Sequence, residues 1–166
     1  MKLEDDEVVL RPYTDEDIPA LVAALNDREI SRWTRIPFPY TEEHAREFLR
    51  SRTETAFAVT DKRSGELLGG IGLRLPTEGV GEVGYWVRRE ARGRGVATRA
   101  LSVITRWALE DQRLVRVQLT AEPGNVASQR VAEKAGYTRE GLLRRFLNIG
   151  GERRDGIMYS RLPEDL

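Results

Sequence analysis

Residues 84–98 read Gly-Tyr-Trp-Val-Arg-Arg-Glu-Ala-Arg-Gly-Arg-Gly-Val-Ala-Thr, and this stretch decides how the whole chain is interpreted. Its first residues, up to Val87, are apolar or aromatic and predict a buried strand. Two glycines, Gly93 and Gly95, follow in a charged segment, and a helical pattern then continues to Glu110. The stretch therefore predicts a strand, a glycine-containing turn and a helix in direct succession.

A turn of this kind is suited to a phosphate ligand. The first turn of a helix has backbone N–H groups without intrahelical acceptors, and it carries a partial positive charge. Glycines at 93 and 95 let the backbone approach a bulky phosphate, and Arg92 and Arg94 add positive charge. We expect a pyrophosphate to fit here. The alternative is a helix N-terminus whose glycines only form a turn.

Three kinds of phosphate-binding loop are candidates for this turn. A Walker A loop ends in Gly-Lys-Ser or Gly-Lys-Thr, and this chain has no such ending. A dinucleotide fingerprint needs a third glycine within a βαβ unit, but Thr98 follows here and the preceding strands look hairpin-connected. A coenzyme A pyrophosphate loop is the third candidate.

The rest of the chain predicts strands and helices in mixed order. Strands are expected over residues 8–11, 55–60, 67–75, 82–87, 115–120, 137–147 and 154–162, and helices over 14–25, 27–33, 41–49, 95–110 and 125–135. This order favours the α/β (α+β) class, with a mixed central sheet of about six or seven strands and helices on both faces. The length of 166 residues suits one domain, residues 1–166.

The composition excludes several function classes. Lys and Arg number 27, as do Asp and Glu, so the net charge of zero argues against a nucleic-acid partner, although 24 of the basic residues are arginine. The chain has no cysteine and one histidine, His44, which we expect on a helix surface without a catalytic role. Thiolate chemistry is therefore excluded, and no metal cofactor is expected.

The expected location is the cytoplasm, without a membrane partner. No apolar run approaches the roughly 20 residues that a membrane-spanning helix needs. The N-terminal residues 1–9 are acidic and lack the apolar region of a signal peptide.

The ordered set of motifs resembles the GNAT superfamily of N-acetyltransferases, in particular its RimJ/RimL-like branch. The superfamily signature is Arg or Gln, two residues, Gly, one residue, then Gly or Ala, and residues 92–97 match it. Likeness to the branch continues in order through nearly the whole chain, at residues 10–12, 36–40, 84–87, 125–128, 131–137 and 151–155. The resemblance implies a GNAT fold, with a splay between two central parallel strands, here residues 82–87 and 115–120.

The resemblance implies acetyl-CoA as co-substrate. Backbone groups of Tyr85, Trp86 and Val87 would then pair with the pantetheine arm. Asn125 matches a position whose side chain bonds the pantetheine; a helix N-cap is the alternative role, and the two are compatible. The pyrophosphate would be held by backbone amides in the segment Arg92, Gly93, Arg94, Gly95, Val96, Ala97 and Thr98.

The resemblance also implies direct attack of an amine on the thioester. Glu82 matches a glutamate that serves as the base in some relatives, and we expect it to act through water; a structural strand residue is the alternative. Many members place a tyrosine where this chain has Ala132. Ser128, which shares a helix face with Asn125, matches a serine credited with serving the departing thiolate; a capping serine is the alternative.

The resemblance implies a primary amine as acceptor, either a protein or peptide N-terminus or a small molecule. Trp33, Phe38 and Tyr40 lie in or beside the variable loop that would cover it, and they are candidate acceptor contacts, with core packing as the alternative. A homodimer is compatible with the resemblance. The competing interpretations are a non-catalytic acyl-CoA-binding module and, from the many arginines, a nucleic-acid-binding domain.

Overall fold

Every expected helix and strand is present in the computed structural model, which describes residues 1–166. Boundaries differ from the expected ones by a few residues. One further strand, β1 (Leu3–Glu4), pairs antiparallel with β2 (Val8–Pro12) and brings the number of strands to eight. A strand of two residues is too short to show an alternating pattern, so the periodicity of the sequence does not reveal β1.

The eight strands form a mixed sheet in the order β1-β2-β3-β4-β5-β6-β8-β7. Strands β5 and β6 are parallel, whereas the pairs β2–β3, β3–β4, β6–β8 and β7–β8 are antiparallel. The mixed α/β fold class is thereby confirmed. The bounds are β3 (Ala56–Asp61), β4 (Leu67–Thr77), β5 (Val80–Val87), β6 (Arg116–Ala121), β7 (Thr138–Ile149) and β8 (Glu152–Arg161).

The chain divides into two compact units. Unit 1 comprises Met1–Gly72 and Tyr85–Ala100, and unit 2 comprises Leu73–Gly84 and Leu101–Leu166. Strands β4 and β5 and helix α4 (Val96–Glu110) belong in part to each unit, as their residue numbers show. None of the helices is long and apolar enough to cross a membrane.

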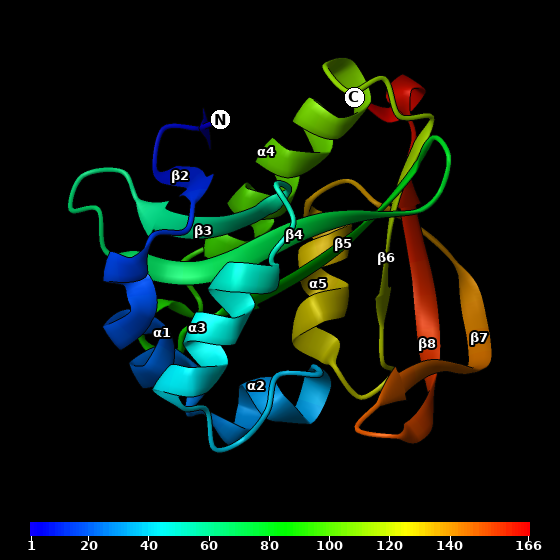
Figure 1. Cartoon of the computed structure of the whole chain (residues 1–166). Coiled ribbons are helices and arrows are strands. Elements are labelled where there is room, and N and C mark those ends of the chain that lie inside the picture. The colour runs from blue at the N-terminus through cyan, green and yellow to red at the C-terminus, as the bar shows by residue number, and fades with distance from the viewer. The chain divides into compact units, whose positions relative to one another are not determined.

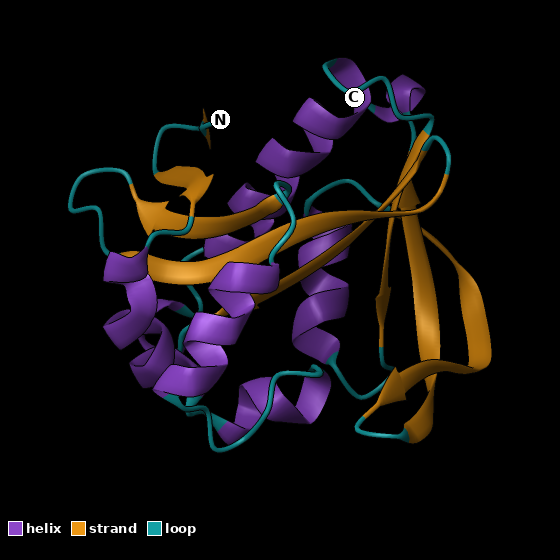
Figure 2. Cartoon of the chain, in the orientation of Figure 1, coloured by secondary structure: helices purple, strands orange, loops and turns teal.

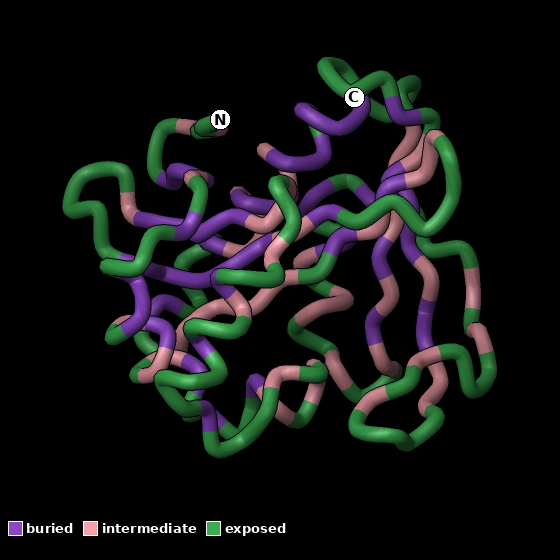
Figure 3. Tube along the Cα trace, viewed as in Figure 1, coloured by how far each residue is buried: buried purple, intermediate pink, exposed green.

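Unit 1 buries one face of three helices. After the 3₁₀ turn η1 (Asp15–Asp17) come α1 (Ile18–Leu25), α2 (Arg28–Trp33) and α3 (Glu42–Ser51), and α1 and α3 lie side by side (Figure 1). Helical spacing places Ile18, Leu21 and Leu25 on one face of α1, and all three are buried. Figure 3 shows buried segments recurring along the helices of this unit. Ile18, Leu21 and Leu25 join the apolar cluster that Tyr13, Tyr40, Ala45 and Leu49 complete.

A buried ion pair supports the start of α1. The Asp17 carboxylate accepts from both terminal nitrogens of Arg11, at 2.8 and 2.9 Å, and from the backbone N–H of Thr14 at 2.9 Å. Burial alone would raise the pKa of Asp17, but the hydrogen bonds from Arg11 and Thr14 outweigh it and lower that pKa. The hydrogen bonds from Arg11 and Thr14 thus compensate for burying the negative charge of Asp17 in unit 1.

Unit 2 contains the remainder of α4, the helix α5 (Val126–Lys134) and the strands β6, β8 and β7 (Figure 2). Alternate residues of β6 are buried, Val117 and Leu119 among them, as a half-buried strand requires. A polar contact also lies in this core, since the hydroxyl oxygens of Thr105 and Tyr137 are 2.6 Å apart.

Gly70 in β4 leaves room for two polar side-chain ends in the core of unit 1. A Cβ built at Gly70 would clash with both the hydroxyl oxygen of Tyr13 and the indole nitrogen of Trp86. Burial raises the pKa of the Tyr13 phenol far above its usual value, although a hydrogen bond with Trp86 acts in the opposite direction. The neutral phenol and the indole thus occupy the space that any larger residue at position 70 would need.

We predict that Gly70→Ala lowers the free energy of unfolding by about 1–3 kcal/mol, because neither ring can yield without disturbing the core. The measurement is urea denaturation. Gly84→Ala is the matched control: a Cβ there meets nothing within 4 Å, so we expect a change of no more than about 0.5 kcal/mol. Equal effects of the two substitutions would contradict the steric explanation.

Candidate active site

The predicted strand, turn and helix succeed one another as expected. Strand β5 ends at Val87, the 3₁₀ turn η2 (Arg89–Ala91) follows, and the exposed turn Arg92–Gly95 leads into α4. Gly93 and Gly95 have φ values of 74° and 77°, a left-handed backbone that side chains with a Cβ rarely adopt. A Cβ at either position would meet no atom within 4 Å, so backbone conformation rather than crowding demands glycine.

The start of α4 presents its amides beside this turn. The backbone N–H of Arg99 donates to the Gly95 carbonyl at 3.0 Å, which closes the first turn of the helix. The amides of Val96 and Ala97 precede this bond and therefore have no acceptor within the helix. Together with the partial positive charge at the helix start, they form a suitable site for an anion.

Arg92 is engaged on three sides within unit 1. Its guanidinium donates to the Asp27 carboxylate at 2.6 Å and to the Val87 carbonyl at 3.3 Å. Its backbone N–H donates to the Arg89 carbonyl at 3.3 Å, because the 3₁₀ turn ends here. The predicted phosphate contact of this segment therefore rests on the amides from Gly93 onward.

Arg94 is held far more loosely than Arg92. Its guanidinium lies 3.9 Å from the Asp61 carboxylate, and 54% of its side chain is exposed. An exposed ion pair at this distance contributes little to stability. Arg94 thus keeps the freedom to turn toward an anionic ligand.

The parallel pairing of β5 with β6 stops partway along both strands. Registered pairs run from Val80 with Arg116 to Glu82 with Gln118. Within unit 2 the strands continue past this point, to Gly84 in β5 and to Ala121 in β6. The loss of pairing beyond Glu82 agrees with the predicted splay of these strands.

The predicted pantetheine-binding residues at the end of β5 are half-buried. Tyr85, Trp86 and Val87 all have intermediate exposure. The Trp86 indole packs against the apolar cluster of unit 1, so its side chain has a structural role there. The predicted cofactor contact of Tyr85–Val87 is made by backbone groups, so the packing of the Trp86 side chain does not conflict with it.

Glu82, the candidate base, is held by two neighbours in unit 2. One carboxylate oxygen pairs with Arg74 of β4, and the other lies 3.5 Å from the Gln118 amide nitrogen of β6. The Glu82 side chain is 16% exposed, whereas that of Arg74 is 63% exposed. Sequence reasoning missed Arg74, because a contact between neighbouring strands depends on their register and not on a motif.

Asn125 and Ser128 meet at the start of α5. The side-chain oxygen of Asn125 accepts from the backbone N–H of Ser128 at 3.2 Å, so the N-cap role of Asn125 is confirmed. Both residues have intermediate exposure. Ala132, at the position where many relatives carry tyrosine, is fully buried, and Tyr137 is engaged with Thr105 in the core.

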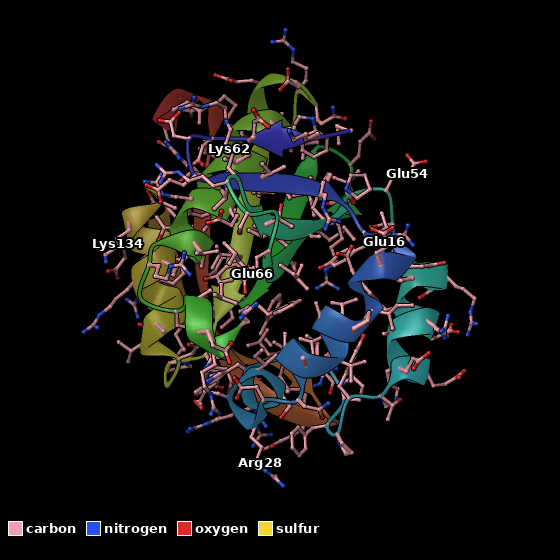
Figure 4. The ribbon with its side chains drawn as sticks, turned by 90° about the vertical axis from the view of Figure 1, so that its left-hand side faces the viewer. Glu16, Arg28, Glu54, Lys62, Glu66 and Lys134 are labelled. Carbon is pink, nitrogen blue, oxygen red and sulfur yellow. The ribbon has the colours of Figure 1, made fainter.

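The three candidate acceptor-binding aromatics have different environments. Tyr40 is 5% exposed and packs in the core of unit 1, which is the alternative role expected for it. Phe38 is 39% exposed and lies 4.4 Å beneath the guanidinium of Arg28, which stands at the exposed beginning of α2 (Figure 4). Trp33 lies under Arg32 at 4.5 Å, so two aromatics remain accessible beside arginines.

His44 lies in the first turn of α3 and forms a capping box with Thr41. The ring nitrogen Nδ1 of His44 accepts from the backbone N–H of Thr41 at 3.1 Å, and the backbone N–H of His44 donates to the Thr41 hydroxyl at 3.2 Å. No group of three His, Cys, Asp or Glu side chains is arranged to hold a metal ion.

Residues 7–138 match the family model described as an acetyltransferase (GNAT) domain. The chain belongs to the GNAT family of acetyltransferases. Members of this family are N-acetyltransferases that use acetyl-CoA, and the glycine turn at residues 92–97 is this chain's version of the family signature.

Relatives within the GNAT family include proteins of the RimJ/RimL-like branch. The chain is 36% identical to "Putative ribosomal N-acetyltransferase YdaF" of Bacillus subtilis over 84 residues, which are 51% of this chain and 46% of that protein. It thus spans about half the length of this relative. It is 26% identical to the ribosomal-protein-S5-alanine acetyltransferase of Vibrio fischeri, covering 99% and 98% of the two chains with a TM-score of 0.80.

The GNAT fold itself is matched still more closely by another solved structure. An acetyltransferase (GNAT family) from Bacillus anthracis covers 99% of both chains with a TM-score of 0.91 at 24% identity. The predicted family, branch and fold are therefore confirmed.

We predict that the two roles of Asn125 can be separated. Asn125→Ala removes the cap and lowers the free energy of unfolding by about 1 kcal/mol, whereas Asn125→Ser keeps a capping oxygen and most of the stability. If the amide also bonds the pantetheine, the serine variant loses CoA affinity despite normal stability. Thermal unfolding and CoA titration of both variants make the comparison, and unchanged CoA affinity in both would leave Asn125 as a cap alone.

Proposed function

We propose that residues 1–166 form one N-acetyltransferase domain that transfers the acetyl group of acetyl-CoA directly to a primary amine. The observation that carries the proposal is the exposed turn at Gly93 and Gly95, followed at once by the amides of Val96 and Ala97, which have no acceptor within the helix. This arrangement stands at the position of the GNAT signature. It supplies anion binding where the family needs it for the CoA pyrophosphate.

The amine must lose a proton before or during its attack, and Glu82 is the proposed base. The attack forms the bond from nitrogen to the acetyl carbon, and the amine proton passes to Glu82 through a water molecule. Backbone N–H groups of Tyr85–Val87 would polarise the thioester carbonyl. The absence of cysteine from the chain supports direct transfer rather than a cysteinyl intermediate.

Collapse of the tetrahedral intermediate breaks the bond from carbon to sulfur and releases the CoA thiolate. Ser128 is proposed to donate a hydrogen bond or relay a proton to this sulfur, since Ala132 replaces the tyrosine of many relatives. A serine hydroxyl is a weak acid, so its contribution is one of stabilising the thiolate. Ser128 lies one helical turn from Asn125, and both occupy the start of α5.

The acceptor is proposed to be a protein N-terminus, with a small-molecule amine as the alternative outcome. Names of two relatives, the ribosomal N-acetyltransferase YdaF and the ribosomal-protein-S5-alanine acetyltransferase, support this choice. The half-buried Trp33 and the exposed Phe38 are the proposed acceptor contacts. A thiol-release assay with acetyl-CoA, N-terminal peptides and small amines tests it; CoA binding without turnover on any amine would indicate a non-catalytic module.

We predict that Gly95→Val abolishes measurable CoA binding, because its side chain would fill the open space beside the first amides of α4. Gly65→Val is the matched control. Gly65 has a φ of 74°, nothing within 4 Å of a built Cβ, and lies in the β3–β4 connection. Both variants should unfold at lower temperature through the same backbone strain, but calorimetry should show normal CoA affinity for Gly65→Val. Normal affinity in a folded Gly95→Val protein would refute the pyrophosphate site.

We predict that Glu82→Gln lowers kcat by about 100-fold or more at neutral pH, as expected for loss of a general base. Arg74→Gln removes the same ion pair and leaves the carboxylate, so its kcat should fall by less than about fivefold. The defect of Glu82→Gln should shrink at high pH, where the amine arrives deprotonated. Similar losses in the two variants would show that Glu82 acts only through its pairing with Arg74.

A further inference from the structure

Asp27 makes more contacts than the start of a helix requires. Its carboxylate accepts from the backbone N–H of Glu29 at 3.0 Å, which is the ordinary contact of an N-cap for α2. The same carboxylate also pairs with Arg92 at 2.6 Å and with Arg89 at 3.4 Å. Serine, threonine or asparagine would cap α2 equally well, so capping alone does not explain a negative charge here.

The Asp27 charge is buried, with only 6% of its side chain exposed. Burial by itself would raise its pKa, but hydrogen bonds from the Glu29 amide and from Arg92 outweigh burial and lower it. The carboxylate is therefore ionised at neutral pH and depends on its arginine partners. A buried charge of this kind holds its partner in place more firmly than an exposed pair does.

Arg92 extends the connection from Asp27 to the glycine turn. Its guanidinium also donates to the carbonyl of Val87, the last residue of β5, at 3.3 Å. Arg92 is the residue directly before Gly93, so its hydrogen bond to Val87 joins the end of β5 to the start of the turn. The Asp27 carboxylate thus anchors one end of the turn whose glycines have left-handed backbones.

We propose that Asp27 is a positioning residue for acetyl-CoA. Through Arg92, Asp27 holds the segment Gly93–Ala97 in the conformation that receives the pyrophosphate. Asp27 also couples pyrophosphate binding at this segment to helix α2. The coupling arises because one carboxylate starts α2 and pairs with the turn. Helix α2 ends at Trp33, a proposed acceptor contact, so cofactor binding would order the helix that carries it. This inference rests on the proposed function.

The direct test is calorimetric titration of CoA into Asp27→Asn. Asparagine keeps the cap on α2 but removes the charge that holds Arg92. We expect CoA to bind about tenfold more weakly, with kcat at saturating acetyl-CoA changed less than about twofold. This split between affinity and turnover would not follow from a general loss of structure.

Asp17→Asn is the matched control, because Asp17 is an equally buried carboxylate of unit 1 that pairs with Arg11 and not with the turn. Both variants should lose thermal stability to a similar degree. Only Asp27→Asn should lose CoA affinity. A similar loss of affinity in both would show a structural effect and overturn the inference.

A double-mutant cycle with Arg92→Gln tests whether Asp27 affects CoA binding through Arg92. Arg92→Gln should weaken CoA binding about as much as Asp27→Asn, and adding Asp27→Asn to it should weaken binding little further. Additive losses would contradict a role of Asp27 through Arg92. If Asp27→Asn fails to fold, Arg92→Gln alone keeps the inference falsifiable, since it leaves the cap intact and must still reduce CoA affinity.

Hydrogen exchange tests the coupling to α2. In the wild-type protein, CoA should slow amide exchange within Arg28–Trp33, and in Asp27→Asn saturating CoA should slow it far less. Equal protection in both proteins overturns the coupling. If the wild-type protein binds no CoA at all, the proposed function fails together with this inference. If it binds CoA and Asp27→Asn binds equally well, only the inference fails.

Discussion

The parallel pairing of β5 with β6 is the constraint on which the rest of the arrangement depends. Two parallel neighbours cannot be joined by a tight hairpin, so the chain must cross over between them, and α4 forms this crossover. The chain therefore leaves β5, reverses direction within a few residues and enters a helix. Left-handed backbones at Gly93 and Gly95 make that reversal, and the same reversal presents the first amides of α4 to a ligand.

Arginines around this turn are matched by acidic residues from other parts of unit 1. Arg88 pairs with Glu66, Arg92 with Asp27, and Arg99 with Asp5 and Glu7. These pairs place a carboxylate beside each of Arg88, Arg92 and Arg99, and the net charge of zero follows from 27 basic and 27 acidic residues. The pairs of Arg88 and Arg99 are partly exposed and add little stability, so their main effect is on the position of the side chains.

The chemistry proposed for the chain depends on groups that need no cofactor of their own. A carboxylate, a hydroxyl and backbone amides suffice for amine attack on a thioester, because the thioester is already an activated acyl donor. Membership of the GNAT family and the glycine turn agree with this requirement. The contacts of Glu82 with Arg74 and Gln118 add a counter-charge and a hydrogen-bonding neighbour to the proposed base.

The sequence by itself determined the local features of the fold and of the cofactor turn. Helical and alternating patterns identified every α-helix and every strand but the two-residue β1, and the spacing of Gly93 and Gly95 predicted the turn, because each depends on residues close together in the chain. The cap at Asn125 was foreseen as an alternative for the same reason.

Tertiary structure decided which residues meet across long separations. Asp27 and Arg92 are 65 residues apart, and no local pattern distinguishes this N-cap from one without a distant partner. Strand register pairs Glu82 with Arg74, and packing places Tyr40 in the core while Phe38 stays accessible. Gly70 is likewise an ordinary strand glycine in the sequence, and only the rings of Tyr13 and Trp86 above it make glycine necessary. Each of these outcomes is set by register and packing, which the chain specifies only as a whole.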